Sequence, residues 1–375
     1  MLENLETIDW HQLTHAYGPA DDIPVLIRYL TSENTELREA AIYELYGNIW
    51  HQGSVYEASA FAIPFLIELL QNEHVQKKEQ ILILLAYLAR GNSWHKKHQN
   101  SIFLIDDRDT PEFQEKVKIE QTWVVNARNR VYEGLRLYLN LLADADPKIR
   151  IASAYTLACL PDRAPEIIPE MLKCLHREAD RQAKASMVLS LGTLVEPESK
   201  YLALFTEILH SKTSDLVKLV AAMMLTQLAR NKTPQEAIAF LVNTISDSKS
   251  VAELYSQLPW ADGDVVADVS RYFCYLEAES NQFPLTDLIE ALSTVDAYSA
   301  LTVAETLLYV TFNGKTILAD EKMSELTKTQ RIVLSAIAQS ENTWKYDANM
   351  SQILKSFALP MWREKLLALV GGELA

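Results

Sequence analysis

Ile23-Pro24-Val25-Leu26-Ile27 recurs forty residues later as Ile63-Pro64-Phe65-Leu66-Ile67, and a polar break and a second apolar segment follow each copy. In the second segments small or apolar residues recur every four positions, as one face of an α-helix requires. The arrangement returns further along the chain, and its first helices end in Leu30, Leu70, Leu142, Leu175 and Leu209. The second helices are predicted to begin near Leu37, Lys77, Ile149, Gln182 and Leu216. This repetition predicts a series of helix pairs.

Helix-start residues mark several of these boundaries. Asp146 precedes a proline at the first helical position, and Asn34 and Ser214 stand at the equivalent places of other pairs. Residues 91–111 lack helical periodicity and interrupt the series as an insertion. A long amphipathic helix with Phe113 and Leu142 at its two ends is predicted to follow.

The composition agrees with a helical chain. The 375 residues include 10 glycines and 13 prolines, about half the usual share. Such scarcity argues against a turn-rich sheet protein, a nucleotide-binding fold with a glycine loop and a disordered polymer. The apolar content of 49% is ample for a core.

The segment Asp146-Pro147-Lys148-Ile149-Arg150 resembles the HEAT-repeat signature, and Leu37-Arg38-Glu39-Ala40-Ala41 is a second match. This resemblance implies an all-α fold, a right-handed α-solenoid of HEAT-like or armadillo-type helical repeats whose second helices line a concave face. We expect HEAT-like repeats over residues 1–250, with the insertion at about 91–111. Residues 251–375 are expected to continue the repeats or to form a helical cap.

Three further segments, Gly47 to Ala58, Pro259 to Asp264 and Leu326 to Arg331, resemble segments of a large bacterial HEAT-repeat family with PBS-lyase HEAT-like repeats. That resemblance implies a bacterial cytoplasm and no particular reaction. Gly47 and Gly53 are expected to adopt positive φ and to shape the turn between two helix pairs.

A Trp-His dipeptide occurs three times, at spacings of 40 and 44 residues that match the repeat. Each tryptophan is either a structural plug between repeats or part of an exposed ridge that anchors a partner. With the neighbouring turn, the ridge gives these candidate partner-binding residues: Trp10, His11, Trp50, His51, Tyr56, Glu57, Trp94 and His95.

Other chemistry finds little support. No HExxH, CxxC or EF-hand pattern accompanies the histidines, so no metal site, cofactor or catalytic residue is predicted. Cys159, Cys174 and Cys274 lie in apolar stretches and are expected to be buried, inert thiols. The polar start and the short apolar runs predict neither a secretory signal nor a membrane span, and therefore a cytoplasmic protein.

The net charge of −15 limits the choice of partners. An acidic chain with an isoelectric point near 5.1 is not expected to bind nucleic acid or anionic membranes. We therefore expect a non-enzymatic protein-binding scaffold, in its most specific form an immunity or antitoxin-like binder of a basic protein. The alternative is an enzyme or a cofactor-lyase-like accessory protein that uses a cleft between the Trp50 loop and the 91–111 insertion. The oligomeric state stays open.

Overall fold

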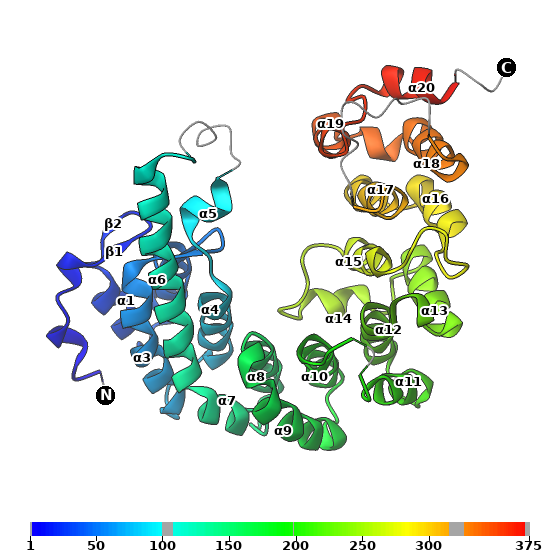
Figure 1. Ribbon diagram of the computed structural model, residues 1–375. Coiled ribbons are helices and arrows are strands. Elements are labelled where there is room, and N and C mark those ends of the chain that lie inside the picture. Colours follow the sequence, from blue (N-terminus) through cyan, green and yellow to red (C-terminus); the bar gives the residue numbers. More distant parts are fainter. Residues whose placement is uncertain (1, 100–107, 198, 315–325, 372–375) are drawn as a thin grey trace. The chain divides into compact units, whose positions relative to one another are not determined.

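The computed structural model describes residues 2–99, 108–197, 199–314 and 326–371, and most of them are helical (Figure 1). Strands in these ranges form two short antiparallel hairpins, which confirms the predicted all-α class. The chain divides into two compact units, Met1–Leu194 and Val195–Ala375, called unit 1 and unit 2. Across the described ranges, every helix is too short or too polar to cross a bilayer.

Unit 1 holds the first helix pairs and both hairpins. The hairpins are β1 (Thr14–His15) with β2 (Gly18–Pro19), and β3 (Trp50–His51) with β4 (Ser54–Val55). Its α-helices are α1 (Ile23–Tyr29), α2 (Thr35–Asn48), α3 (Glu57–Gln71), α4 (Lys78–Arg90), α5 (Trp94–His98), α6 (Pro111–Glu133), α7 (Leu135–Leu141), α8 (Pro147–Ala158), α9 (Ala164–Arg177) and α10 (Arg181–Leu194). Short 3₁₀ helices are η1 (Leu5–Thr7), η2 (Trp10–Gln12) and η3 (Pro161–Arg163).

Unit 2 is helical throughout its described residues. Its α-helices are α11 (Leu202–His210), α12 (Asp215–Ala229), α13 (Gln235–Ser246), α14 (Ala252–Ser256), α15 (Val265–Tyr272), α16 (Leu285–Thr294), α17 (Ala297–Thr311), α18 (Lys328–Gln339), α19 (Asp347–Ser356) and α20 (Arg363–Gly371). The 3₁₀ helices are η4 (Arg230–Lys232), η5 (Phe273–Tyr275) and η7 (Asn342–Trp344). Residues 195–250, which the sequence groups with the first repeats, lie in this unit.

The predicted helix pairs are confirmed as α1–α2, α3–α4, α7–α8, α9–α10 and α11–α12. Each second helix begins within two residues of its predicted start. The predicted caps are also present. Asn34 accepts a hydrogen bond from a helix N–H at 2.8 Å, Asp146 at 2.9 Å and Ser214 at 3.4 Å.

Second helices in unit 1 pack against one another, with α8 lying between α4 and α10 (Figure 1). Small hydroxyl side chains allow close approach and use the neighbouring backbone as acceptor. Thr156 of α8 donates to the carbonyl of Leu82 in α4 at 2.8 Å, and Ser190 of α10 donates to the carbonyl of Ala154 in α8 at 2.8 Å. These buried bonds satisfy polar groups that would otherwise destabilise the core.

Two arginines occupy equivalent positions in different helix pairs. Arg38 donates to the carbonyls five and six residues before it at 2.9 and 2.6 Å, and Arg150 does the same at 3.0 and 2.9 Å. Each guanidinium therefore closes the loop of its own pair. Each also reaches the next loop: Arg38 bonds Gln76 at 2.8 Å, and Arg150 forms a partly buried ion pair with Glu178 at 2.7 Å.

Local details differ from the sequence-based expectation. The long helix predicted after residue 111 is broken at Gly134 into α6 and α7. A glycine is required there, because a Cβ at this position would lie 2.2 Å from the hydroxyl oxygen of the buried Tyr138. Gly47 lies inside α2, whereas Gly53 has the expected positive φ of 85°. The insertion contains α5, and its residues 100–107 lie outside the described residues.

Candidate functional site

The first Trp-His pair is mostly internal. Trp10 is 5% exposed, its indole N–H donates to the carbonyl of Leu5 at 2.8 Å, and its ring packs against Phe65. His11 is exposed, and its Nδ1 lies 3.1 Å from the carboxylate of Asp21, whose hydrogen bond raises the pKa of His11. Trp10 fills the interior of unit 1, and His11 alone of this pair reaches the surface.

The second pair lies on the β3–β4 hairpin, whose turn at 52–53 has positive φ at both residues, as a type I′ turn requires. The half-buried Trp50 stacks on Tyr87 with ring centroids 4.8 Å apart. Nδ1 of His51 lies 3.3 Å from the hydroxyl of Tyr17, which belongs to the turn between β1 and β2. The two hairpins therefore bring Tyr17 and His51 together.

Tyr56 and Glu57 begin α3. The backbone N–H of Tyr56 donates to the hydroxyl of Ser59 at 2.9 Å, and burial, with the nearby Glu120 carboxylate, raises the pKa of Tyr56 to about 12. Oε2 of Glu57 lies 3.4 Å from the hydroxyl of Thr14. Tyr56 therefore stays neutral at physiological pH.

The third pair is organised by Glu120 of α6, a buried carboxylate. It accepts hydrogen bonds from the hydroxyl of Ser93 at 2.6 Å, from the backbone N–H of His95 at 2.9 Å and from Nδ1 of His95 at 2.6 Å. Trp94 packs against the rings of His95 and His98. Since Nδ1 of His95 donates to a carboxylate, Nε2 carries the lone pair of the neutral imidazole.

The second and third pairs lie on adjacent segments. Lys97 of α5 donates to the carbonyl of Gln52, which holds α5 beside the hairpin. Within the part of the chain that the structure describes, however, no hydrogen bond joins His51, Glu57 and His95 to one another; each has its own separate partner. The same part of the chain contains no group of three or more His, Cys, Asp or Glu side chains that could hold a metal ion.

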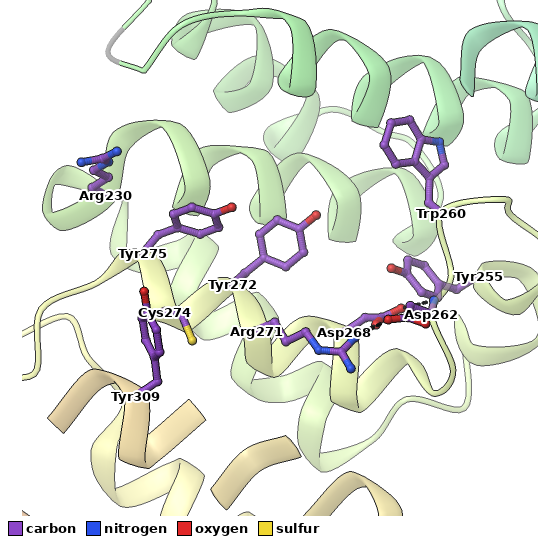
Figure 2. Close-up of a pocket in the computed structure, with 10 residues that line it drawn as sticks. All are labelled: Arg230, Tyr255, Trp260, Asp262, Asp268, Arg271, Tyr272, Cys274, Tyr275 and Tyr309. Atoms are coloured by element: carbon purple, nitrogen blue, oxygen red, sulfur yellow. Dashed lines mark hydrogen bonds and ion pairs between the residues drawn. The ribbon is translucent and has the colours of Figure 1, made fainter. Parts of the chain in front are cut away.

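Unit 2 contains a cavity of about 730 Å³ with mainly aromatic walls (Figure 2). It is formed by η4, α14, the loop 259–264, α15 with η5, and α17. The lining residues are Arg230, Tyr255, Trp260, Asp262, Asp268, Arg271, Tyr272, Cys274, Tyr275 and Tyr309. We call this cavity the aromatic pocket. Its volume lies in the range of sites that bury drug-sized ligands.

Asp268 holds one wall of the aromatic pocket in place through hydrogen bonds. Its carboxylate is buried and accepts hydrogen bonds from the backbone N–H of Asp262 at 2.9 Å, from Arg271 at 2.6 Å and from the hydroxyl of Tyr255. Burial outweighs these bonds and raises the pKa of Asp268. The network ties the loop 259–264 to α15, and Gly263 at φ 102° allows the chain to turn there.

The segment that supplies most of the pocket lining is acidic in sequence, although the lining itself holds two arginines and two aspartates. Residues 251–300 contain nine acidic residues and a single basic one, Arg271. The side chain of Asp262 is 88% exposed at the rim, and its carboxylate lies 3.4 Å from Arg271. Because Asp268 already has three donors, Asp262 is the carboxylate with free capacity for a ligand.

Arg230 lies at the other end of the aromatic pocket from Trp260 and Asp262, with Tyr275 and Tyr272 between them (Figure 2). It follows α12 with φ 52° and ψ −128°, a conformation that residues with a side chain rarely adopt. Burial raises the pKa of Tyr275, and the nearby Arg230 guanidinium opposes that rise.

The aromatic pocket includes none of the candidate residues chosen from the sequence. The segment 259–264 was noted for a family resemblance and not as a site. Its tryptophan beside two aspartates, followed by Tyr272 and Tyr275, is a signal that was available. Arg230 and Tyr309 join these residues only through helix packing, which local spacing does not reveal.

The cysteines agree in part with the expectation of buried thiols. Cys159 is buried, whereas Cys174 and Cys274 are partly exposed. Burial raises the pKa of each thiol, to about 12 for Cys159 and about 11 for Cys274. All three are therefore protonated at neutral pH, including the one in the pocket wall.

Comparisons with known proteins give this chain no family. No protein-family model matches the sequence, and no curated protein matches it either. Among solved structures, the chain is similar to an engineered protein at 16% identity, over 94% of this chain and 89% of that one, with a TM-score of 0.33.

Proposed function

We propose that this protein is a non-enzymatic binding protein for a basic protein partner, and that a cationic side chain of the partner enters the aromatic pocket. One observation carries the proposal: a cavity of about 730 Å³ is lined by five aromatic side chains, and four of them come from residues 251–300, a segment with nine acidic residues and one basic residue. Aromatic faces attract ammonium and guanidinium groups, and buried pockets of this kind are where interfaces concentrate binding energy.

The two aspartates of the aromatic pocket have different roles, one structural and one in binding. Asp268 is held by three donors and keeps the loop 259–264 in place. Asp262 is exposed and shares only a long contact of 3.4 Å with Arg271, so an incoming cation competes with Arg271 for it. Long-range attraction by the acidic segment would speed the encounter with a basic protein.

The architecture we propose is a right-handed α-solenoid of HEAT-like repeats in the bacterial cytoplasm. The matching loop contacts of Arg38 and Arg150 support repeating units, and the HEAT-like segments support the family resemblance. An immunity or antitoxin-like role toward a cationic toxin is the most specific form of this proposal. Nucleic acid and membranes are not proposed as partners, since both carry negative charge.

The test is a titration with synthetic peptides. A labelled ten-residue peptide rich in lysine and arginine is compared by fluorescence anisotropy with a peptide in which glutamate replaces each basic residue. We expect only the basic peptide to bind, and Trp260→Ala and Asp262→Asn to weaken its binding at least about tenfold, the size of a moderate hot spot.

Matched controls come from the same unit. Trp362 is 58% exposed and Glu253 is an exposed carboxylate of the same acidic segment, and neither lines the aromatic pocket. Trp362→Ala and Glu253→Gln should therefore bind like the wild type. Equal binding of the acidic peptide, or equal losses in the control variants, would contradict the proposal.

A second candidate function, an enzyme or cofactor-lyase-like accessory protein, is favoured by the oriented imidazole of His95. Its Nδ1 lies 2.6 Å from Glu120, the arrangement that suits a general base. Mass spectrometry of a small-molecule extract incubated with wild type or Glu120→Gln tests this function. A product formed by the wild type alone would favour it over binding.

A further inference from the structure

Arg230 is an exposed residue that combines an unfavourable backbone conformation with a solvent-accessible charge. Its φ of 52° and ψ of −128° belong to a region that glycine occupies readily and that side chains disfavour. Within the described residues, its guanidinium has no hydrogen bond and no ion pair, although it lines the aromatic pocket. Residues held in such conformations cluster at active sites and ligand-binding sites, where the surrounding structure holds them in place.

Other arginines of the chain show what a structural role looks like. Arg38 and Arg150 bond loop carbonyls, and Arg363 donates to the carbonyl of Ala338 at 2.8 Å. Arg230 makes no contact of this kind within the described residues, although its charge opposes the rise that burial causes in the pKa of Tyr275. Packing therefore does not explain why a strained position carries an arginine.

We propose that Arg230 binds an anionic group of the partner, so that the aromatic pocket selects a peptide segment in which a carboxylate lies close in sequence to the cationic side chain. The inference rests on the proposed function: the cation lies between Trp260 and Asp262, and the carboxylate reaches Arg230 at the opposite end (Figure 2). The volume of about 730 Å³ holds two neighbouring side chains. Guanidinium suits this role because it pairs with carboxylates in a two-pronged geometry.

Binding of both a cation and a carboxylate of the same peptide predicts that an added carboxylate increases the affinity. With a net charge of −15, the protein as a whole repels an added carboxylate on a ligand. A gain in affinity from such a carboxylate therefore needs a local cationic group in the pocket. Arg271 does not supply it, because Asp268 already engages it at 2.6 Å.

The experiment uses pairs of peptides that differ in one residue. Each acetylated, amidated peptide carries one lysine and, one to four positions later, either aspartate or asparagine. We expect at least one spacing at which the aspartate peptide binds the wild type about fivefold more tightly than its asparagine partner. In Arg230→Gln this preference should disappear or reverse, whereas in Asp262→Asn both peptides should weaken and the preference should persist.

A second variant separates the charge from the strain. Arg230→Gly removes both, so it should lose the aspartate preference while its thermal midpoint rises by about 2–4 °C. Arg230→Gln keeps a side chain at the strained position, so its midpoint should stay close to that of the wild type. A lower midpoint for Arg230→Gly would show that the side chain stabilises the fold, and this result would overturn the assignment.

The outcomes distinguish the two proposals. If lysine peptides bind but no spacing favours aspartate, or if the preference survives Arg230→Gln, the role of Arg230 is refuted and the cation pocket stands. If no lysine peptide binds, with or without aspartate, the proposed function fails together with this inference.

Discussion

Unit 1 and unit 2 both gather aromatic side chains, and the two groups differ in what lies beside the rings. In unit 1 the rings satisfy one another: Trp50 stacks on Tyr87, and Trp10 packs against Phe65 with its indole N–H bonded to a carbonyl. In unit 2 the rings also have neighbours, such as Tyr275 beside Tyr272 with ring centroids 6.1 Å apart, but Trp260 and Tyr272 in addition border a cavity of about 730 Å³. The difference teaches that aromatic content does not identify a binding surface; a ring is available only where packing leaves space beside it.

The largest expected effect compares two tryptophans. Trp10→Ala removes a 5% exposed indole and should lower the free energy of unfolding by about 3–5 kcal/mol. Trp260→Ala removes a partly exposed pocket wall and should cost less than about 1–2 kcal/mol, while it weakens peptide binding. Urea denaturation of both variants, followed by circular dichroism, provides the measurement.

His11→Ala is the control for the first variant, because His11 is exposed beside Trp10 and should change stability by less than about 0.5 kcal/mol. If Trp260→Ala is as unstable as Trp10→Ala, the pocket rings belong to the core and the contrast between the units is lost.

A smaller effect compares two buried tyrosines. Among the described residues, the buried hydroxyl of Tyr138 in unit 1 has no hydrogen-bond partner, whereas the hydroxyl of Tyr255 in unit 2 bonds the carboxylate of Asp268. Tyr138→Phe should leave stability unchanged or raise it by about 1 kcal/mol, and Tyr255→Phe should lower it by about 1.5–3 kcal/mol. Thermal denaturation of the two variants measures the difference, and an equal response would contradict the distinct hydrogen bonding.

The smallest effect is a pair of opposite pH dependences. Burial alone would raise the pKa of Glu178, but hydrogen bonds from Arg150 and the backbone lower it below 4.5, whereas burial raises the pKa of Asp268 above 3.8. The contribution of Glu178 to stability is therefore complete above pH 4.5 and is lost as pH falls through the lowered pKa. The contribution of Asp268 is present below pH 3.8 and is lost as pH rises through the raised pKa.

Denaturant titrations between pH 3 and 6.5 on the wild type, Glu178→Gln and Asp268→Asn test these signs. Each variant should lose the pH dependence that its carboxylate contributes to the free energy of unfolding. The difference between wild type and variant should therefore change with pH in opposite directions for the two variants. Difference curves of the same sign would show that the two carboxylates are not in contrasting environments.

Most of the helical framework could be predicted because local signals agree with the packing. The four-residue spacing of apolar residues and the caps at Asn34, Asp146 and Ser214 place the second helices within two residues of their starts. The break at Gly134 could not be predicted because the apolar periodicity continues across it, from Val131 to Leu135 and Tyr138.

The candidate site was much harder to predict. The regular Trp-His spacing drew attention to unit 1, where the structure gives Trp10 and Trp50 packing partners. The spacing itself does not tell a ridge from a set of structural plugs. The aromatic pocket depends on residues about eighty positions apart, from Arg230 to Tyr309, and on backbone angles at Arg230 that composition does not encode.

The loop contacts of Arg38 and Arg150 have a consequence for redesign. Because each guanidinium binds carbonyls five and six residues earlier, the loop of each of these two helix pairs is held by a residue of the same pair. A pair can then be duplicated or excised as a module, provided that the acceptor at the following junction, Gln76 or Glu178, travels with it. We therefore expect that the chain could be lengthened or shortened by one helix pair at a time.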